Sequence, residues 1–141
     1  MRLVKEFEIK KARKSAVAAV AKDETLVGLF PDADTEIVEK KKDRKTTRSR
    51  YKVLGREGEA TFHFTFGKDG DVAFSKVCDG RIWKRLDGSL TFETAGAKKT
   101  LVRIEMDGAT KALVPEFTIK GPMQEQIEQM AAALRERLEE A

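Results

Sequence analysis

The single histidine and the single cysteine are the side chains of this sequence with the widest catalytic repertoire. His63 alternates with Phe62 and Phe64, so its side chain is expected on the strand face opposite the two phenylalanines. A general base needs a partner that orients it, and the local sequence places no serine or carboxylate beside His63. Cys78 would need His63 to approach it across a sheet, and a buried structural thiol is far commoner. We therefore predict no catalytic residues.

Metal and cofactor sites are not predicted either. One histidine and one cysteine leave too few ligands for a zinc or iron site. The glycines between residues 55 and 70 fall at strand turns, and none forms a phosphate-binding loop ahead of a helix. Paired carboxylates such as Asp32 and Asp34 have no acid–base partner beside them. The sequence therefore favours a non-catalytic role.

Apolar and aromatic side chains are stronger candidates, because small-molecule pockets are lined mainly by such groups. Methionines on a final helix would add surface that adapts to varied ligands. The competing interpretation is a filled core, which any sheet-plus-helix domain needs. Inward polar groups that could orient a ligand are Lys5, Tyr51, Arg85 and Trp83. The predicted ligand-binding residues are Phe62, Phe64, Phe66, Phe74, Trp83, Met106, Met123, Ile127 and Met130.

Eight basic residues fall within residues 40–52, the densest charge cluster of the chain. A basic hairpin of this kind could bind an anionic membrane surface or RNA. The alternative is a solvated hairpin whose charges protect a sheet edge from aggregation. A net charge of +4 is too balanced to indicate nucleic acid, and DNA binding is not expected. The predicted membrane contacts are Lys41, Lys42, Lys45, Arg48 and Arg50.

A long final helix is the clearest of the elements that must position these residues. Apolar residues at 123, 127, 130, 134 and 138 are spaced by 4, 3, 4 and 4 and form one stripe. Gly121-Pro122 is expected to begin this helix, because proline loses no hydrogen bond at the first position. Residues 109–120 leave two possibilities, an earlier helix start or a loop broken at Pro115.

The rest of the chain predicts one opening strand, two short helices and then strands joined by turns. Residues 2–10 alternate as a half-buried strand, residues 11–22 form an alanine-rich helix, and Asp23 caps a second helix over residues 24–30. Turns are expected at Asp43-Arg44 and Asp79-Gly80, a bend at Asp87-Gly88, and a strand end at Asp107-Gly108. The predicted strands after these helices are 36–42, 45–54, 60–66, 71–78, a bent strand made of 81–86 and 90–94, and 99–106.

This order predicts an α+β fold, a curved antiparallel sheet of six to seven strands wrapped around a long C-terminal helix, in a single domain over residues 1–141. It resembles the helix-grip fold of the START and polyketide cyclase-like superfamily (SRPBCC), also called Bet v 1-like. The resemblance rests on the opening strand, the helix at residues 15–23, the Leu29-Phe30-Pro31 exit, the Asp-Gly turns and the terminal helix. Val17–Val20 departs from the pattern, since members often carry a large apolar residue there.

The resemblance implies that the protein binds or carries a hydrophobic small molecule, such as a lipid, quinone, sterol or polyketide, in a cavity between sheet and helix. A minority of such proteins are enzymes, so a polyketide cyclase or dehydrase is one alternative. The other is a protein- or membrane-interaction module that uses the 40–52 hairpin.

Composition is consistent with these expectations. A chain of 141 residues with 40% hydrophobic residues fits one domain with a real core. One cysteine excludes an internal disulfide and fits a reducing compartment. The N-terminal residues lack the apolar core of a signal peptide, and no apolar run is long enough to span a bilayer. We therefore expect a cytoplasmic protein.

Overall fold

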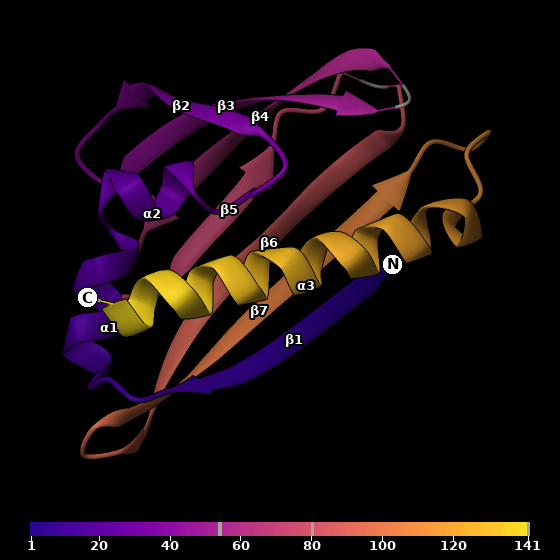
Figure 1. Cartoon of the computed structure of the whole chain (residues 1–141). Helices are drawn as coiled ribbons and strands as arrows, with labels where there is room; N and C mark the ends of the chain where they lie inside the picture. Colours follow the sequence, from indigo (N-terminus) through magenta and orange to yellow (C-terminus); the bar gives the residue numbers. More distant parts are fainter. Residues whose placement is uncertain (54, 80, 141) are drawn as a thin grey trace.

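The computed structural model describes residues 1–53, 55–79 and 81–140. Seven strands form one curved antiparallel sheet in the order β1-β7-β6-β5-β4-β3-β2, and the long helix α3 lies across one face of it (Figure 1). The elements are β1 (Arg2–Ile9), α1 (Arg13–Val20), α2 (Asp23–Val27), β2 (Asp34–Lys40), β3 (Arg44–Val53), β4 (Arg56–Phe66), β5 (Val72–Lys76), β6 (Trp83–Gly96), β7 (Lys99–Thr110) and α3 (Glu116–Glu140). The predicted α+β helix-grip architecture is confirmed.

Sheet pairing brings the two ends of the chain together. Strands β2 to β7 pair in chain order, and β1 pairs with β7 at one edge, with Leu3 opposite Met106 and Phe7 opposite Val102. Alternation decides which side chains face α3: along β7 the buried positions recur at every second residue from Thr100 to Gly108. The core therefore lies between this face of the sheet and α3.

Helix α3 buries the predicted stripe but begins earlier than predicted. Its first residue is Glu116, directly after Pro115, so the expected start at Gly121-Pro122 is wrong. Pro122 lies inside the helix, where it cannot donate a hydrogen bond to the carbonyl of residue 118. The stripe is buried as predicted, at Met123, Ile127, Met130, Leu134 and Leu138.

Two Asp-Gly pairs expected to bend or end strands lie within them. Strand β6 continues through Asp87-Gly88 and β7 through Asp107-Gly108. Neither glycine has a positive φ; each instead lacks a Cβ where an aromatic ring packs. A Cβ on Gly88 would lie 2.5 Å from Phe74 Cζ, and one on Gly108 would lie 2.5 Å from Trp83 Cζ3. Non-local packing therefore overrides the local turn signal.

Smaller differences occur at element ends. Asp23 is the first residue of α2 and does not cap it, because Lys22 occupies the cap position without a side-chain bond. The hairpin at Asp43-Arg44 is confirmed by the pairing of Lys40 with Lys45. Leu54, the predicted end of a strand, and Gly80, half of the predicted Asp79-Gly80 turn, lie outside the described residues.

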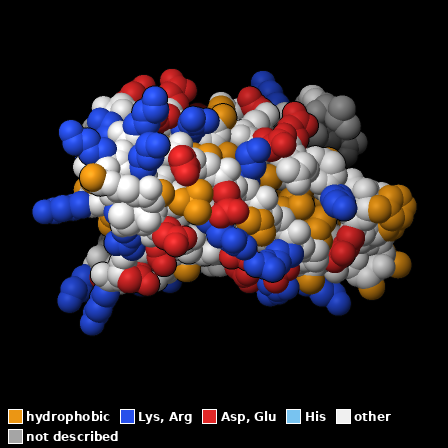
Figure 2. All heavy atoms as spheres, turned by 90° about the horizontal axis from the view of Figure 1, so that it is seen from below, with side chains coloured by type: hydrophobic (Ala, Val, Ile, Leu, Met, Phe, Trp, Pro, Cys, Tyr) orange, Lys and Arg blue, Asp and Glu red, His pale blue; other side chains and the backbone are white. Residues whose placement is uncertain are grey.

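The connection from β7 to α3 and the first turn of α3 carry the most exposed large apolar side chains. Leu113 is 96% exposed and Phe117 is 81% exposed. Figure 2 shows hydrophobic side chains at the end of the molecule that holds this connection, and lysine and arginine side chains projecting at the opposite end. Within the described residues, no helix combines the length and apolar character needed to cross a lipid bilayer.

Candidate functional site

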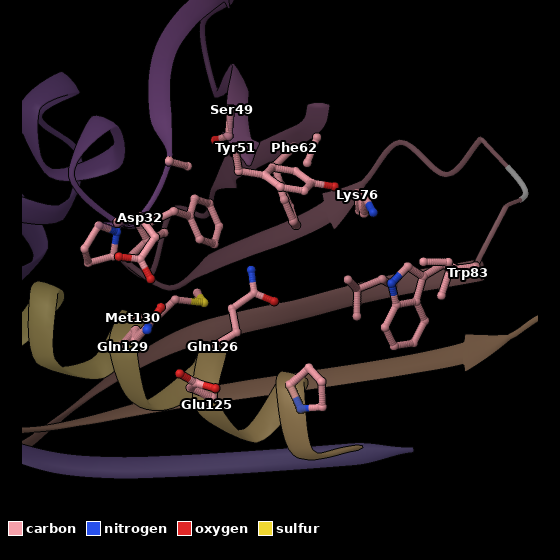
Figure 3. Close-up of a pocket in the computed structure, with 18 of the residues that line it drawn as sticks. Asp32, Ser49, Tyr51, Phe62, Lys76, Trp83, Glu125, Gln126, Gln129 and Met130 are labelled. Carbon is pink, nitrogen blue, oxygen red and sulfur yellow. The ribbon is translucent and has the colours of Figure 1, made fainter. Parts of the chain in front are cut away.

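A pocket of about 420 Å³ lies between the N-terminal half of α3 and the part of the sheet formed by β3 to β6 (Figure 3). Residues 29–33, which connect α2 to β2, close one side. The helix contributes Pro122, Gln126 and Met130 among others. The volume is near the lower end of the roughly 300–1,000 Å³ that small-molecule sites occupy.

The floor of the pocket is aromatic and aliphatic. Phe30 from the α2–β2 connection stacks on Phe62 of β4 with ring centroids 5.2 Å apart. Phe62 in turn meets the edge of Phe74 at 6.4 Å, so the floor continues into the hydrophobic core. Leu29 and Met130 are buried beside these rings. Such a surface stabilises apolar ligands by removing their area from water.

Glycines hold two aromatic side chains of the pocket in place. Tyr51 lies across Gly58, its cross-strand partner, and a Cβ on Gly58 would lie 2.5 Å from Tyr51 Cζ. Trp83 lies against Gly108 in the same way. The absence of a Cβ at these positions lets each ring rest on the neighbouring strand and leaves the space above it open.

The structure places only three of the nine predicted ligand-binding residues at the pocket. Phe62, Trp83 and Met130 line it. Phe66 is half-buried at the far end of β4, where Lys45 Nζ lies 5.7 Å from its ring centroid. The predicted residues that are buried in the core without lining the pocket are Phe64, Phe74, Met106, Met123 and Ile127. Alternation identified the correct face, but the position along each strand decides between core and pocket.

Several lining residues were not predicted. Leu29 and Phe30 come from a connection whose path depends on tertiary structure, and Gln126 is polar beside an apolar stripe. Gly58, a glycine inside a strand, is a local signal that supports the predicted inward position of Tyr51, since such a glycine marks a close approach by another group. Of the predicted orienting groups, Tyr51 and Trp83 line the pocket, whereas Arg85 pairs with Asp87 and Asp107 and does not line it.

Histidine and cysteine lie away from this pocket. His63 is half-buried on the face opposite Phe62 and Phe64, as predicted, and its Nδ1 is hydrogen-bonded to Thr46 Oγ1 at 2.8 Å. The Cys78 thiol donates to the Lys76 carbonyl at 3.6 Å. Neither residue is among those that line the pocket. Among the described residues, no group of three histidine, cysteine or acidic side chains is placed to hold a metal ion.

The basic hairpin has many acidic partners. Lys45 pairs with Asp23 at 2.8 Å, and Lys40 pairs with the same carboxylate. Hydrogen bonds from Lys40 and then Lys45 lower the pKa of Asp23. Arg48 and Arg50 both reach Glu59, at 3.2 and 4.0 Å.

Two lysines at the tip of the hairpin differ from Lys40 and Lys45. Lys41 and Lys42 are exposed and have no carboxylate partner within the described residues. The charge available to an anionic surface is therefore smaller than the sequence suggested.

No protein-family model and no curated protein matches the sequence. Solved structures do match its fold. The aromatase/cyclase ZhuI from Streptomyces sp. R1128 has a TM-score of 0.78 at 14% identity, covering 98% of this chain and 90% of that one. A START superfamily protein from Mycobacterium smegmatis has a TM-score of 0.77 at 17% identity, covering 99% and 97%. A STAR-related lipid transfer protein from Xanthomonas axonopodis has a TM-score of 0.67 at 17% identity, covering 97% and 85%. These likenesses show that the chain has the helix-grip fold of such proteins.

Proposed function

We propose that the protein binds a hydrophobic small molecule in the pocket between α3 and the sheet, and that it does so without changing it chemically. The observation that carries this proposal is an apolar-floored cavity of about 420 Å³ at the place where the helix leaves the sheet uncovered. The neighbouring folds support the binding of a hydrophobic molecule, because their names include an aromatase/cyclase and a lipid transfer protein.

The size of the pocket narrows the class of ligand that it can hold. The driving force would be burial of apolar surface, at roughly 25 cal/mol per Å². A cavity near the lower end of the usual range favours one ring system or one acyl chain over a lipid with two chains. Quinone-, sterol- or polyketide-like molecules and single-chain lipids fall in this class.

The enzymatic alternative has weaker support. A cyclase or dehydrase needs an acid or base that is oriented by a partner and reaches the substrate. His63, the base that would most favour such chemistry, lies on the opposite face of β4. The titratable groups that line the pocket, among them Asp32 and Glu125, form no hydrogen-bonded pair within the described residues.

A pocket-filling variant tests the proposal. Ala60 lines the pocket, so Ala60→Phe should occupy the space that a ligand needs. Native mass spectrometry of the protein purified from its own host should show a bound molecule in the wild type and in Ala73→Phe. Ala73 is exposed on β5 and serves as the control. The Ala60→Phe protein should be free of the molecule while keeping its circular dichroism spectrum.

A wild-type protein that is apo by mass, and that shows no thermal shift with a panel of quinones, sterols and fatty acids, would contradict the proposal. A bound molecule that survives in Ala60→Phe would place binding elsewhere on the protein.

Membrane docking through the 40–52 hairpin stays a second prediction, centred on Lys41 and Lys42. Their exposure and lack of a carboxylate partner within the described residues favour it. Sedimentation with anionic vesicles should retain the wild type at low salt and lose it at high salt. Lys41→Glu combined with Lys42→Glu should abolish this retention. A wild type that stays in solution at low salt would reject the prediction.

A further inference from the structure

We infer that the ligand of this pocket carries one anionic group on an apolar body, and that Lys76 and Tyr51 bind the anion. This inference rests on the proposed function and adds the chemical class of the ligand and its orientation.

Lys76 occupies a position that points toward the helix side of the sheet. In β5 the buried residues are Val72 and Phe74, and the residues between them, Ala73 and Ser75, are exposed. By the same alternation Lys76 lies on the inner face of the sheet. It is half-buried, lines the pocket and pairs across the strands with Phe62. An ammonium group on an apolar surface loses hydration unless an anion or hydrogen-bond acceptor compensates it.

No acidic side chain forms an ion pair with Lys76 within the described residues. The pKa of Asp79 is lowered by a hydrogen bond from the Arg81 backbone and, more weakly, by the charges of Arg81 and Lys76. The Lys76 ammonium group takes part in none of the ion pairs or hydrogen bonds of the described residues, whereas Lys40 and Lys45 both pair with Asp23. Most other lysines without an ion pair are exposed to solvent, whereas Lys76 is half-buried and lines the pocket. Lys76 is therefore a half-buried cation that lines the cavity, and the described residues supply no ion-pair partner for it.

Tyr51 places a second donor beside this cation. Its ring lies across Gly58, which fixes its direction, and Figure 3 shows the hydroxyl pointing toward Lys76. The Tyr51 hydroxyl has no hydrogen-bond partner within the described residues, whereas the neighbouring inward Ser49 is bonded to Thr35 at 2.8 Å. An ammonium and a phenol hydroxyl that converge on one space can both donate to a single anionic oxygen group.

The remaining charges orient the ligand. Lys76 places a cation on the strand side of the pocket. Asp32 and Glu125 line the other side, from the α2–β2 connection and from α3, as Figure 3 shows. An anion is attracted to the side of the pocket that holds Lys76 and is repelled by the side that holds Asp32 and Glu125. The anionic group therefore lies at Lys76, and the apolar body lies over Phe62 and Met130.

The recognised chemistry is an oxygen anion such as a carboxylate, a sulfonate or a phosphate monoester. Two fluorescent probes isolate this feature, because they share one phenyl-naphthylamine skeleton. Anilinonaphthalene sulfonate carries a sulfonate, and N-phenylnaphthylamine does not. Both probes brighten in apolar sites, so the Kd of each is measured by titration of the full-length protein.

The informative quantity is the Kd of the neutral probe divided by the Kd of the anionic probe. Lys76→Met should lower this ratio about tenfold relative to the wild type, the size expected of one charge-assisted hydrogen bond. Tyr51→Phe should lower it by a smaller factor. Lys84→Met, which removes an exposed lysine of β6 that does not line the pocket, should leave it unchanged. Neutral-probe affinity should change little in all three variants.

The other results of these titrations distinguish failure of this inference from failure of the proposed function. An unchanged ratio in Lys76→Met would overturn this inference and leave the proposed function standing. Failure of the wild type to bind either probe would overturn the proposed function and this inference with it. Retention of the anionic probe by Ala60→Phe would place its site outside the pocket and would also overturn the inference.

Discussion

The two ends of α3 cover the sheet differently. The helix packs against α1, α2, β1 and β7, and Leu134 and Leu138 in its C-terminal half are buried. Toward its N-terminus the helix presents Pro122 and Gln126 to β3–β6, and a cavity of about 420 Å³ remains. One helix with one continuous apolar stripe therefore borders both a filled core and an open pocket.

The difference lies in what faces the helix. At the filled end, α1 and α2 supply additional apolar side chains, among them Ala16, Val20 and Leu26. At the open end no second helix is present in the described residues, and two positions of the inner face carry the short side chains of Ser49 and Ala60. A cavity of this kind arises where small or polar residues replace the large apolar residues that would fill it.

The largest effect is expected at the filled end. Leu134→Ala should lower the free energy of unfolding by about 2–5 kcal/mol, because a cavity replaces a fully enclosed side chain. Urea denaturation followed by circular dichroism measures this change. Leu113→Ala, at a side chain that is 96% exposed, is the control and should shift stability by less than about 0.5 kcal/mol. Equal effects in the two variants would contradict the assignment of the core.

A glycine substitution at the open end should have the next largest effect. Gly108→Ala places a Cβ 2.5 Å from Trp83 Cζ3, so the indole must move. Overpacking of this kind costs about 1–3 kcal/mol, and the shifted ring should also weaken binding of N-phenylnaphthylamine. Because Trp83 is the only tryptophan, intrinsic fluorescence reports its movement directly. An unchanged emission spectrum would show that Trp83 does not rest on Gly108.

A glycine-to-alanine substitution within α3 should instead raise the free energy of unfolding. Apart from the adjacent residues and the backbone of its own helix, a Cβ on Gly121 would meet no atom within 4 Å, and alanine would replace the poorest helix former after proline. The free energy of unfolding should rise by about 0.5–1 kcal/mol, since alanine loses less backbone entropy in a helix. Thermal denaturation of the Gly121→Ala and Gly108→Ala proteins side by side tests the contrast. Destabilisation by Gly121→Ala would indicate that residue 121 is not helical.

The smallest effect concerns the ion pairs that connect α2 to the β2–β3 hairpin. Hydrogen bonds from Lys40 and Lys45 lower the pKa of Asp23 below its usual 3.8, so this pairing stabilises the folded state above that pH. The contribution is lost as the pH falls through the lowered pKa. Asp23→Asn should therefore be slightly less stable than the wild type at neutral pH and equally stable in strong acid. Denaturation at several pH values measures the difference in stability between the two proteins. A difference that stays the same at every pH would contradict its assignment to the charge of Asp23.

Local patterns predicted much of this architecture. The spacing of Met123, Ile127 and Leu134 was sufficient to identify α3 and its buried face, because a helix repeats every 3.6 residues whatever lies against it. Alternation likewise placed Phe62 and His63 on opposite faces of β4. The start of α3 was predicted wrongly. Pro115 and Pro122 are both compatible with the beginning of a helix, and only the tertiary path of the chain after β7 ends at Thr110 shows which of the two applies.

The sequence by itself determined the order of elements, the opposite facing of Phe62 and His63, and the apolar stripe of α3, because all three follow from interactions between neighbours in the chain. Tertiary structure decided which inward residues line a pocket. Phe62 and Phe64 lie two residues apart on the same face, yet one lines the cavity and the other is core. That distinction depends on where α3, the α2–β2 connection and the strand glycines meet, and these contacts join residues distant in the sequence.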